Sequence, residues 1–201
     1  MKNGRRRTDP AFAAWLLALA VAAAPGGRAA RAENPPSDQA HASIIEHWPD
    51  RPRVIIRAMT AKYGMPNRLN QIEVVWYDNG PWRRTVIHRY SSLGFFGARE
   101  NDYLEQTIGC RIPDDKVSAL KRFGKRIDIV RSGNELSSRA ESESMNFLAL
   151  NLAGEIIAGT RSAKDARDFY RKTEELSKSG KTSAYLEEFV LPVEHGRLEF
   201  H

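Results

Sequence analysis

The stretch EVVWYDNGPWRRTVIHRY, from Glu73 to Tyr90, indicates the fold class of this protein. Apolar and polar residues alternate on both sides of a turn signal, which is the pattern of two antiparallel strands joined as a hairpin. Asn79-Gly80 is a common two-residue turn, but that turn would need an amide hydrogen at Pro81. We therefore expect strands at about 73–77 and 82–90, joined by a four-residue loop that pairs Tyr77 with Trp82.

Patterns on either side of this hairpin predict the remaining elements. Upstream, apolar residues recur at helical spacing from Asp50 to Tyr63, and Gly64 and Pro66 end that helix. Downstream, the expected elements are a strand at about 103–112, a short helix at 114–123, strands at 127–130 and 136–141, and helices at about 143–158 and from a capping box at Ser162. Hairpin connections imply an antiparallel sheet of about five strands with helices packed on one face, an α+β fold.

The stretch MNFLALNLAGEII, from Met145 to Ile157, is apolar on almost every side of a helix. Its 13 residues are too few to span a bilayer, which needs about 20. The pattern therefore predicts a central buried helix. Asn146 and Asn151 would then lie at least partly buried, where an amide must find hydrogen-bond partners. Either they bond to the backbone of loops, or they line a ligand pocket near this helix.

The N-terminus has the layout of a cleavable secretory signal peptide. Arg5, Arg6 and Arg7 form a basic head, an apolar body runs over 11–24, and Ala30-Arg31-Ala32 supplies a cleavage site. We predict a signal peptide over residues 1–32, cleavage after Ala32, a disordered lead-in over 33–40 and a single domain over 41–201. The protein would be periplasmic or secreted, without stable membrane insertion after cleavage. Both the general and the twin-arginine export routes stay open.

Most of the chain's positive charge lies in this signal. The full chain has 31 Lys and Arg against 25 Asp and Glu, a net charge of +6. Residues 1–32 hold six of the bases and one of the acids, so the mature chain has 25 bases and 24 acids. A nucleic-acid binder is expected to keep a strong basic field. We therefore expect no nucleic-acid partner.

Motifs for catalysis and metal binding are incomplete in this chain. Cys110 is the one cysteine, and strand alternation places it toward the core, where a thiol is inert. The histidines lack metal-ligand spacing. Ser118-Ala119-Leu120-Lys121 and Gly180-Lys181-Thr182 match only fragments of acyl-transfer and phosphate-binding motifs. We assign no catalytic residue, metal or cofactor, and the question of enzymatic activity stays open.

The hairpin holds the strongest candidate binding residues. They are aromatic, arginine and histidine side chains at closely spaced positions: Trp76, Tyr77, Trp82, Arg83, Arg84 and His88. Strict alternation puts Tyr77, Trp82, Arg84 and His88 on one face, and Trp76 and Arg83 on the other. An exposed face of this composition is enriched at binding interfaces. Alternatively, the tryptophans belong to the core and arginine stems cover them. Which face is exposed stays open.

Two resemblances arise from these residues. GPWRRTVIHR and MNFLALNLAGEIIAGTRSAKDARDFY resemble a group of uncharacterised exported bacterial proteins over most of the mature chain. That resemblance implies no activity. The order of helix, Tyr63-Gly64-Met65-Pro66, strand with Trp76, turn and strand is similar to the small envelope-assembly domain of the SmpA/BamE type. The chain departs from that pattern because it lacks a lipidation cysteine and adds a second hairpin and two helices.

The sequence thus favours an exported, non-catalytic binding or accessory module of the cell envelope, with another envelope protein as its partner. The alternative is a small periplasmic hydrolase or ligand-binding carrier with a pocket near the helix from Met145 to Ile157. Oligomeric state stays open.

Overall fold

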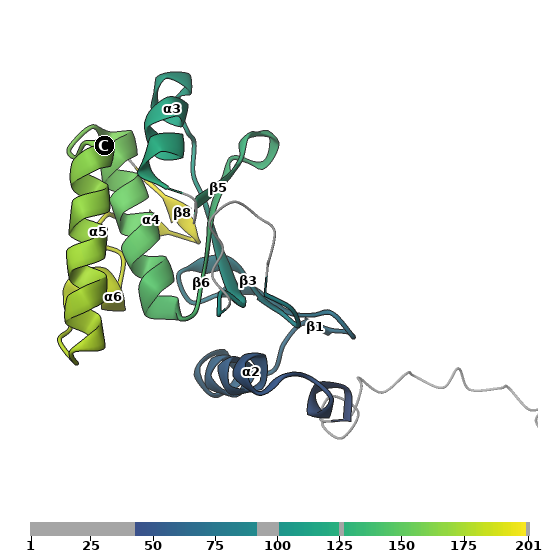
Figure 1. Ribbon diagram of the computed structural model, residues 1–201. Helices are drawn as coiled ribbons and strands as arrows, with labels where there is room; N and C mark the ends of the chain where they lie inside the picture. Colours follow the sequence, from purple (N-terminus) through teal and green to yellow (C-terminus); the bar gives the residue numbers. More distant parts are fainter. Residues whose placement is uncertain (1–42, 92–100, 125–126, 200–201) are drawn as a thin grey trace, which may run out of the picture. The chain divides into compact units, whose positions relative to one another are not determined.

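The computed structural model describes residues 43–91, 101–124 and 127–199 (Figure 1). The predicted signal peptide and lead-in lie outside these residues. The helices and strands follow in this order: α2 (Asp50–Tyr63), β1 (Arg68–Leu69), β2 (Glu73–Asn79), β3 (Trp82–His88), β4 (Leu104–Gly109), α3 (Asp114–Phe123), β5 (Ile127–Val130), the 3-10 turn η1 (Arg131–Gly133), β6 (Glu135–Ala140), α4 (Glu143–Ala158), α5 (Ala163–Lys178), α6 (Ala184–Glu187), β7 (Val193–Glu194) and β8 (Arg197–Leu198).

The strands form one sheet in the order β1-β2-β3-β4-β6-β5, and neighbours along this path are antiparallel. The C-terminal hairpin of β7 and β8 joins this sheet by a single parallel pairing between Gly109 and Arg197. The predicted α+β class and antiparallel sheet are therefore confirmed. The additions are the short elements β1, α6, β7 and β8, of which the last three lie in the tail.

Helices α2 and α4 cover the same face of the sheet. Residues that are paired across adjacent strands point to the same face of a sheet. Ile87 pairs with Leu104, and Leu104 pairs with Ala140, so these three side chains point to one face. At one end Ile56 of α2 shares a buried cluster with Ile87 and Leu104. At the other end Leu148 of α4 shares a buried cluster with Ala140. Helix α4 also contacts α3, α5 and α6, and Figure 1 shows α4 and α5 side by side.

Helix α4 is the central helix that its all-round apolar pattern predicted. Twelve of its 16 residues are buried, so the helix has a neighbour on nearly every side. It begins after Ser142, whose side chain accepts a hydrogen bond from the Met145 amide, and it ends at Gly159 in the left-handed conformation. Among the described residues, no helix has both the length and the apolar character needed to cross a bilayer.

The turn of the β2–β3 hairpin differs from the predicted one. Asn79 pairs with Trp82, so the loop is Gly80-Pro81, and the predicted pairing of Tyr77 with Trp82 is wrong. Gly80 has a φ of 62°, and the ring of Pro81 holds its φ near about −65°. This combination of signs is that of a type II′ turn, in which the second loop residue donates no ladder hydrogen bond. Proline is therefore accepted at position 81.

The side-chain alternation also shifts by one residue close to this turn. Asp78 has a φ of 48° and no ladder partner. Trp82 lies in the helix-covered core. Arg83 and Arg84 instead form ion pairs with Glu135 and Glu105, which alternate with core residues and point away from the helices. A strict period of two could not predict this, because one left-handed residue reverses the faces beyond it.

Candidate functional site

The six hairpin residues selected from the sequence do not form one surface. Trp76 and Trp82 are buried, with exposed fractions of 1% and 0%. The Trp76 indole Nε1 donates to the Gly64 carbonyl oxygen at 2.9 Å, and the Trp82 Nε1 donates to Glu143 Oε1 at 2.6 Å. Both tryptophans are thus core residues with satisfied indole groups. Tyr77 is exposed.

The remaining hairpin residues lie on the face of the sheet that points away from α2 and α4, and acids on β4 and β6 pair with them. Arg83 Nε lies 3.4 Å from Glu135 Oε1, and Arg84 Nη2 lies 3.6 Å from Glu105 Oε1. His88 Nε2 lies 3.1 Å from Glu105 Oε2. Burial alone would raise the pKa of Glu105, but the His88 hydrogen bond and nearby positive charges hold that pKa below its ordinary value. Neither hairpin arginine is left without a counter-charge.

The two asparagines of α4 are completely buried and bonded within the protein. Asn146 Nδ2 donates to the Leu104 carbonyl oxygen at 3.1 Å and to Gln106 Oε1 at 3.0 Å. Asn151 Nδ2 donates to the Glu188 carbonyl oxygen at 2.8 Å, and its Oδ1 accepts from the Val190 amide at 2.9 Å. Asn146 thus connects α4 to the sheet, whereas Asn151 holds the segment that follows α6.

Glu143, which the sequence did not single out, joins several parts of the chain. Its Oε1 accepts from Tyr63 Oη at 2.6 Å, Trp82 Nε1 at 2.6 Å and Gln106 Nε2 at 3.1 Å. Its Oε2 pairs with Lys62 Nζ at 2.5 Å. The end of α2, two strands and the start of α4 therefore meet at one carboxylate. No local spacing could reveal this site, because the donors come from three distant segments.

This carboxylate remains ionised at neutral pH. Burial acts to raise the pKa of Glu143, but hydrogen bonds from Lys62, Tyr63 and Trp82 outweigh it, and the pKa lies below its ordinary value. Burial and the bond to Glu143 raise the pKa of Tyr63. An ionised carboxylate surrounded by donors is a poor proton donor. The cluster therefore holds elements together, and it fixes Lys62 and Tyr63 beside a surface groove.

That groove is the candidate functional site. It has a volume of about 600 Å³ and is lined by Lys62, Tyr63, Gly80, Pro81, Phe147 and residues 187–193. Phe147 and Phe189 lie 5.1 Å apart between ring centroids, and Trp82 packs on both at 4.6 and 5.1 Å. This aromatic cluster supports the groove from below. Val190 is 38% exposed and presents an apolar side chain at the wall.

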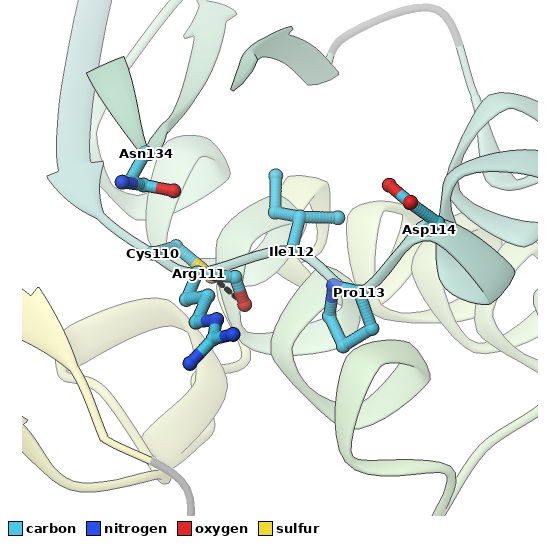
Figure 2. Close-up of a pocket in the computed structure, with 6 residues that line it drawn as sticks. All are labelled: Cys110, Arg111, Ile112, Pro113, Asp114 and Asn134. Atoms are coloured by element: carbon cyan, nitrogen blue, oxygen red, sulfur yellow. Dashed lines mark hydrogen bonds between the residues drawn. The ribbon is translucent and has the colours of Figure 1, made fainter. Parts of the chain in front are cut away.

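A second hollow, of about 270 Å³, lies where β4 leads into α3 (Figure 2). Cys110, Ile112 and Asn134 are among the residues that line it. Burial raises the pKa of the Cys110 thiol to about 12, so the thiol is protonated at neutral pH and is not a nucleophile. Its core position agrees with its strand alternation. Within the described ranges, no three His, Cys, Asp or Glu residues are grouped to hold a metal ion.

Comparisons of the chain with family models, curated proteins and solved structures gave no match. The groove and the N-terminal sequence are therefore the features of this protein that bear on its function.

Proposed function

We propose that this protein is an exported, non-catalytic binding module of the cell envelope, and that the groove holds part of another envelope protein. The observation that supports this proposal is the combination of an apolar, aromatic floor with walls that are fixed by side-chain hydrogen bonds. The basic, apolar and A-x-A order of residues 1–32 supports export. The hairpin residues then act as core and support, and the groove replaces them as the binding surface.

The groove walls are held in place before any partner arrives. Asn151 bonds to the backbone of Glu188 and Val190, and Glu143 holds the side chains of Lys62 and Tyr63. Gly154 lets the C-terminal segment approach α4, since a Cβ there would lie 2.7 Å from Leu191 Cδ1. Preformed walls lose little conformational entropy on binding, so more of the contact energy appears as affinity.

A selection of peptides from a displayed random library on the immobilised mature domain tests this function. Selected peptides should bind the wild-type domain and lose at least about tenfold in affinity on Val190→Asp, because a charge at the apolar wall must be desolvated by the ligand. Val54→Asp is the matched control, since Val54 is an exposed valine of α2 outside the groove. The proposal would be contradicted if the selected peptides bind the Val190→Asp variant with unchanged affinity, or if the selection yields no binding peptide.

A ligand carrier is the second candidate. The groove volume lies within the range of small-molecule sites, about 300–1,000 Å³, and Phe147 of α4 lines it. Native mass spectrometry of the mature protein, purified gently from the source cell, separates the two functions. A stoichiometric small molecule that is lost on Val190→Asp would favour the carrier. A co-purified protein that is lost on the same substitution would favour the binding module.

A further inference from the structure

We propose that the groove accepts a polypeptide segment in which apolar side chains are followed by lysine or arginine. This inference rests on the proposed function and specifies the chemistry of its partner. The size of the groove, its apolar floor and the charges along its rim support the proposal.

One wall of the groove is a continuous stretch of seven residues, 187–193. This stretch bends at Glu188, Val190 and Leu191, and between the end of α6 and the start of β7 it has no helix and no strand pairing. The groove volume of about 600 Å³ leaves room for more than one ligand side chain.

The floor favours apolar ligand side chains. Phe147 and Phe189 line the groove together with Leu191, Val193 and Pro81, and these residues offer carbon surface to the occupant. The polar groups at the α2 end are already engaged, because Lys62 Nζ and Tyr63 Oη both bond to Glu143. An apolar side chain can therefore enter without leaving these donors unsatisfied.

The rim carries a negative charge that is not balanced within the described part of the chain. Lys62 is the one cation among the lining residues, and its charge is matched by Glu143. Glu187 and Glu188 are exposed, and no ion pair among the described residues involves either carboxylate. Glu187 accepts a hydrogen bond from the Thr182 hydroxyl at 2.5 Å, which leaves its charge in place. A cationic ligand residue complements this rim, whereas an acidic one is repelled.

Fluorescence anisotropy with labelled synthetic peptides tests the inference. One peptide carries valine, phenylalanine and proline followed by two arginines, and matched versions replace the arginines by glutamine or by glutamate. The arginine peptide should bind at least about tenfold more tightly than the glutamine peptide at low ionic strength, and the glutamate peptide should bind most weakly. Added salt should lower the affinity of the arginine peptide far more than that of the glutamine peptide.

Variants distinguish this inference from the proposed function. The double variant Glu187→Gln and Glu188→Gln should abolish the preference for arginine and leave the glutamine peptide unchanged. Both side chains are exposed, so the fold does not depend on their charge. Glu175→Gln, an exposed acid of α5, is the matched control.

Each contrary outcome has a distinct meaning. If all three peptides bind equally and all are lost on Val190→Asp, the groove is a peptide site and the charge inference is overturned. If the glutamate peptide binds most tightly, the inference is also overturned. If no peptide binds, or if Val190→Asp leaves the affinity of the peptides unchanged, both the inference and the proposed function fail.

Discussion

Glu143 joins four segments of the chain through one carboxylate. Its side chain is 12% exposed, whereas that of Lys62 is 50% exposed. The three hydrogen bonds that Glu143 accepts from Tyr63, Trp82 and Gln106 are therefore more shielded from water than its ion pair. Burying this charge is unfavourable, and only its surrounding donors make it tolerable. The contribution of Glu143 is therefore best measured as the effect of removing it. Its removal leaves the indole of Trp82 without its acceptor, whereas Gln106 Nε2 keeps a hydrogen bond to Thr85 Oγ1.

We predict that Glu143→Ala lowers the free energy of unfolding by roughly 1–3 kcal/mol, as expected when a buried donor loses its acceptor. The side chain of Lys62 is half exposed, so loss of the ion pair itself adds little. Urea unfolding at pH 7, followed by tryptophan fluorescence, measures this change. Lys164→Ala, which removes an exposed ion pair with Asp168 on α5, is the control and should leave the unfolding midpoint almost unchanged. Equal effects of the two substitutions would show that the Glu143 cluster does not hold the elements together.

At the scale of elements, the segment after α6 depends on one side chain of α4. Asn151 Nδ2 donates to the carbonyl oxygens of Tyr185 and Glu188, and its Oδ1 accepts from the Val190 amide. An asparagine can make these three hydrogen bonds at once because its Nδ2 carries two N–H donors and its Oδ1 is an acceptor. The wall of the groove is therefore positioned from the central helix.

We predict that Asn151→Leu releases this wall. Leucine has a similar volume but leaves two carbonyl groups and one amide without a partner, which destabilises the protein by about 1–3 kcal/mol for each buried group that water cannot reach. The rate of amide hydrogen exchange should rise most at residues 185–190, and all peptides that bind the groove should lose affinity. Unchanged exchange at these residues would show that the wall is held by other contacts.

Local signals were sufficient for the bounds of helices α3 and α4. They run over 114–123 and 143–158, as their patterns predicted, because a glycine directly follows each helix. Strand ends were less predictable. The third strand pairs only over Leu104–Gly109 rather than 103–112, because pairing depends on the neighbouring strands as well as on local alternation.

For the whole molecule, acid should weaken the fold through Glu143. Burial acts to raise the pKa of this group, but its hydrogen bonds hold the pKa below the ordinary value in the folded state. Its contribution to stability is therefore complete above the unfolded value of about 4.3. It is lost as pH falls through the lower, folded value.

We predict that the free energy of unfolding declines below about pH 4.3 and that this decline is smaller in Glu143→Gln, which cannot ionise. Urea unfolding at several pH values between 7 and 3 measures both curves. Glu105, whose pKa is also lowered in the fold, supplies part of the remaining decline. Parallel curves for the wild type and the variant would exclude Glu143 as a source of the acid sensitivity.

The proposed export also leads to a prediction for the intact chain. Expression of the full chain in a bacterial host should yield a periplasmic protein whose first residue is Glu33, as intact-mass spectrometry can show. Ala32→Leu should block cleavage, because the signal peptidase accepts only small residues there, and the 22.7 kDa precursor should accumulate. A cytoplasmic precursor in the wild type would contradict export.

Sequence patterns alone were enough for the order of the main elements, the antiparallel sheet and the central buried helix. These features follow from periodicity, turn residues and caps, which act over a few residues. The tertiary structure decided which hairpin side chains are buried, because the left-handed Asp78 changes the alternation. It also decided the carboxylate cluster and the groove, since Lys62, Trp82, Glu143 and residues 187–193 are far apart in sequence. Such contacts form only when the chain is folded, so no local sequence pattern predicts them.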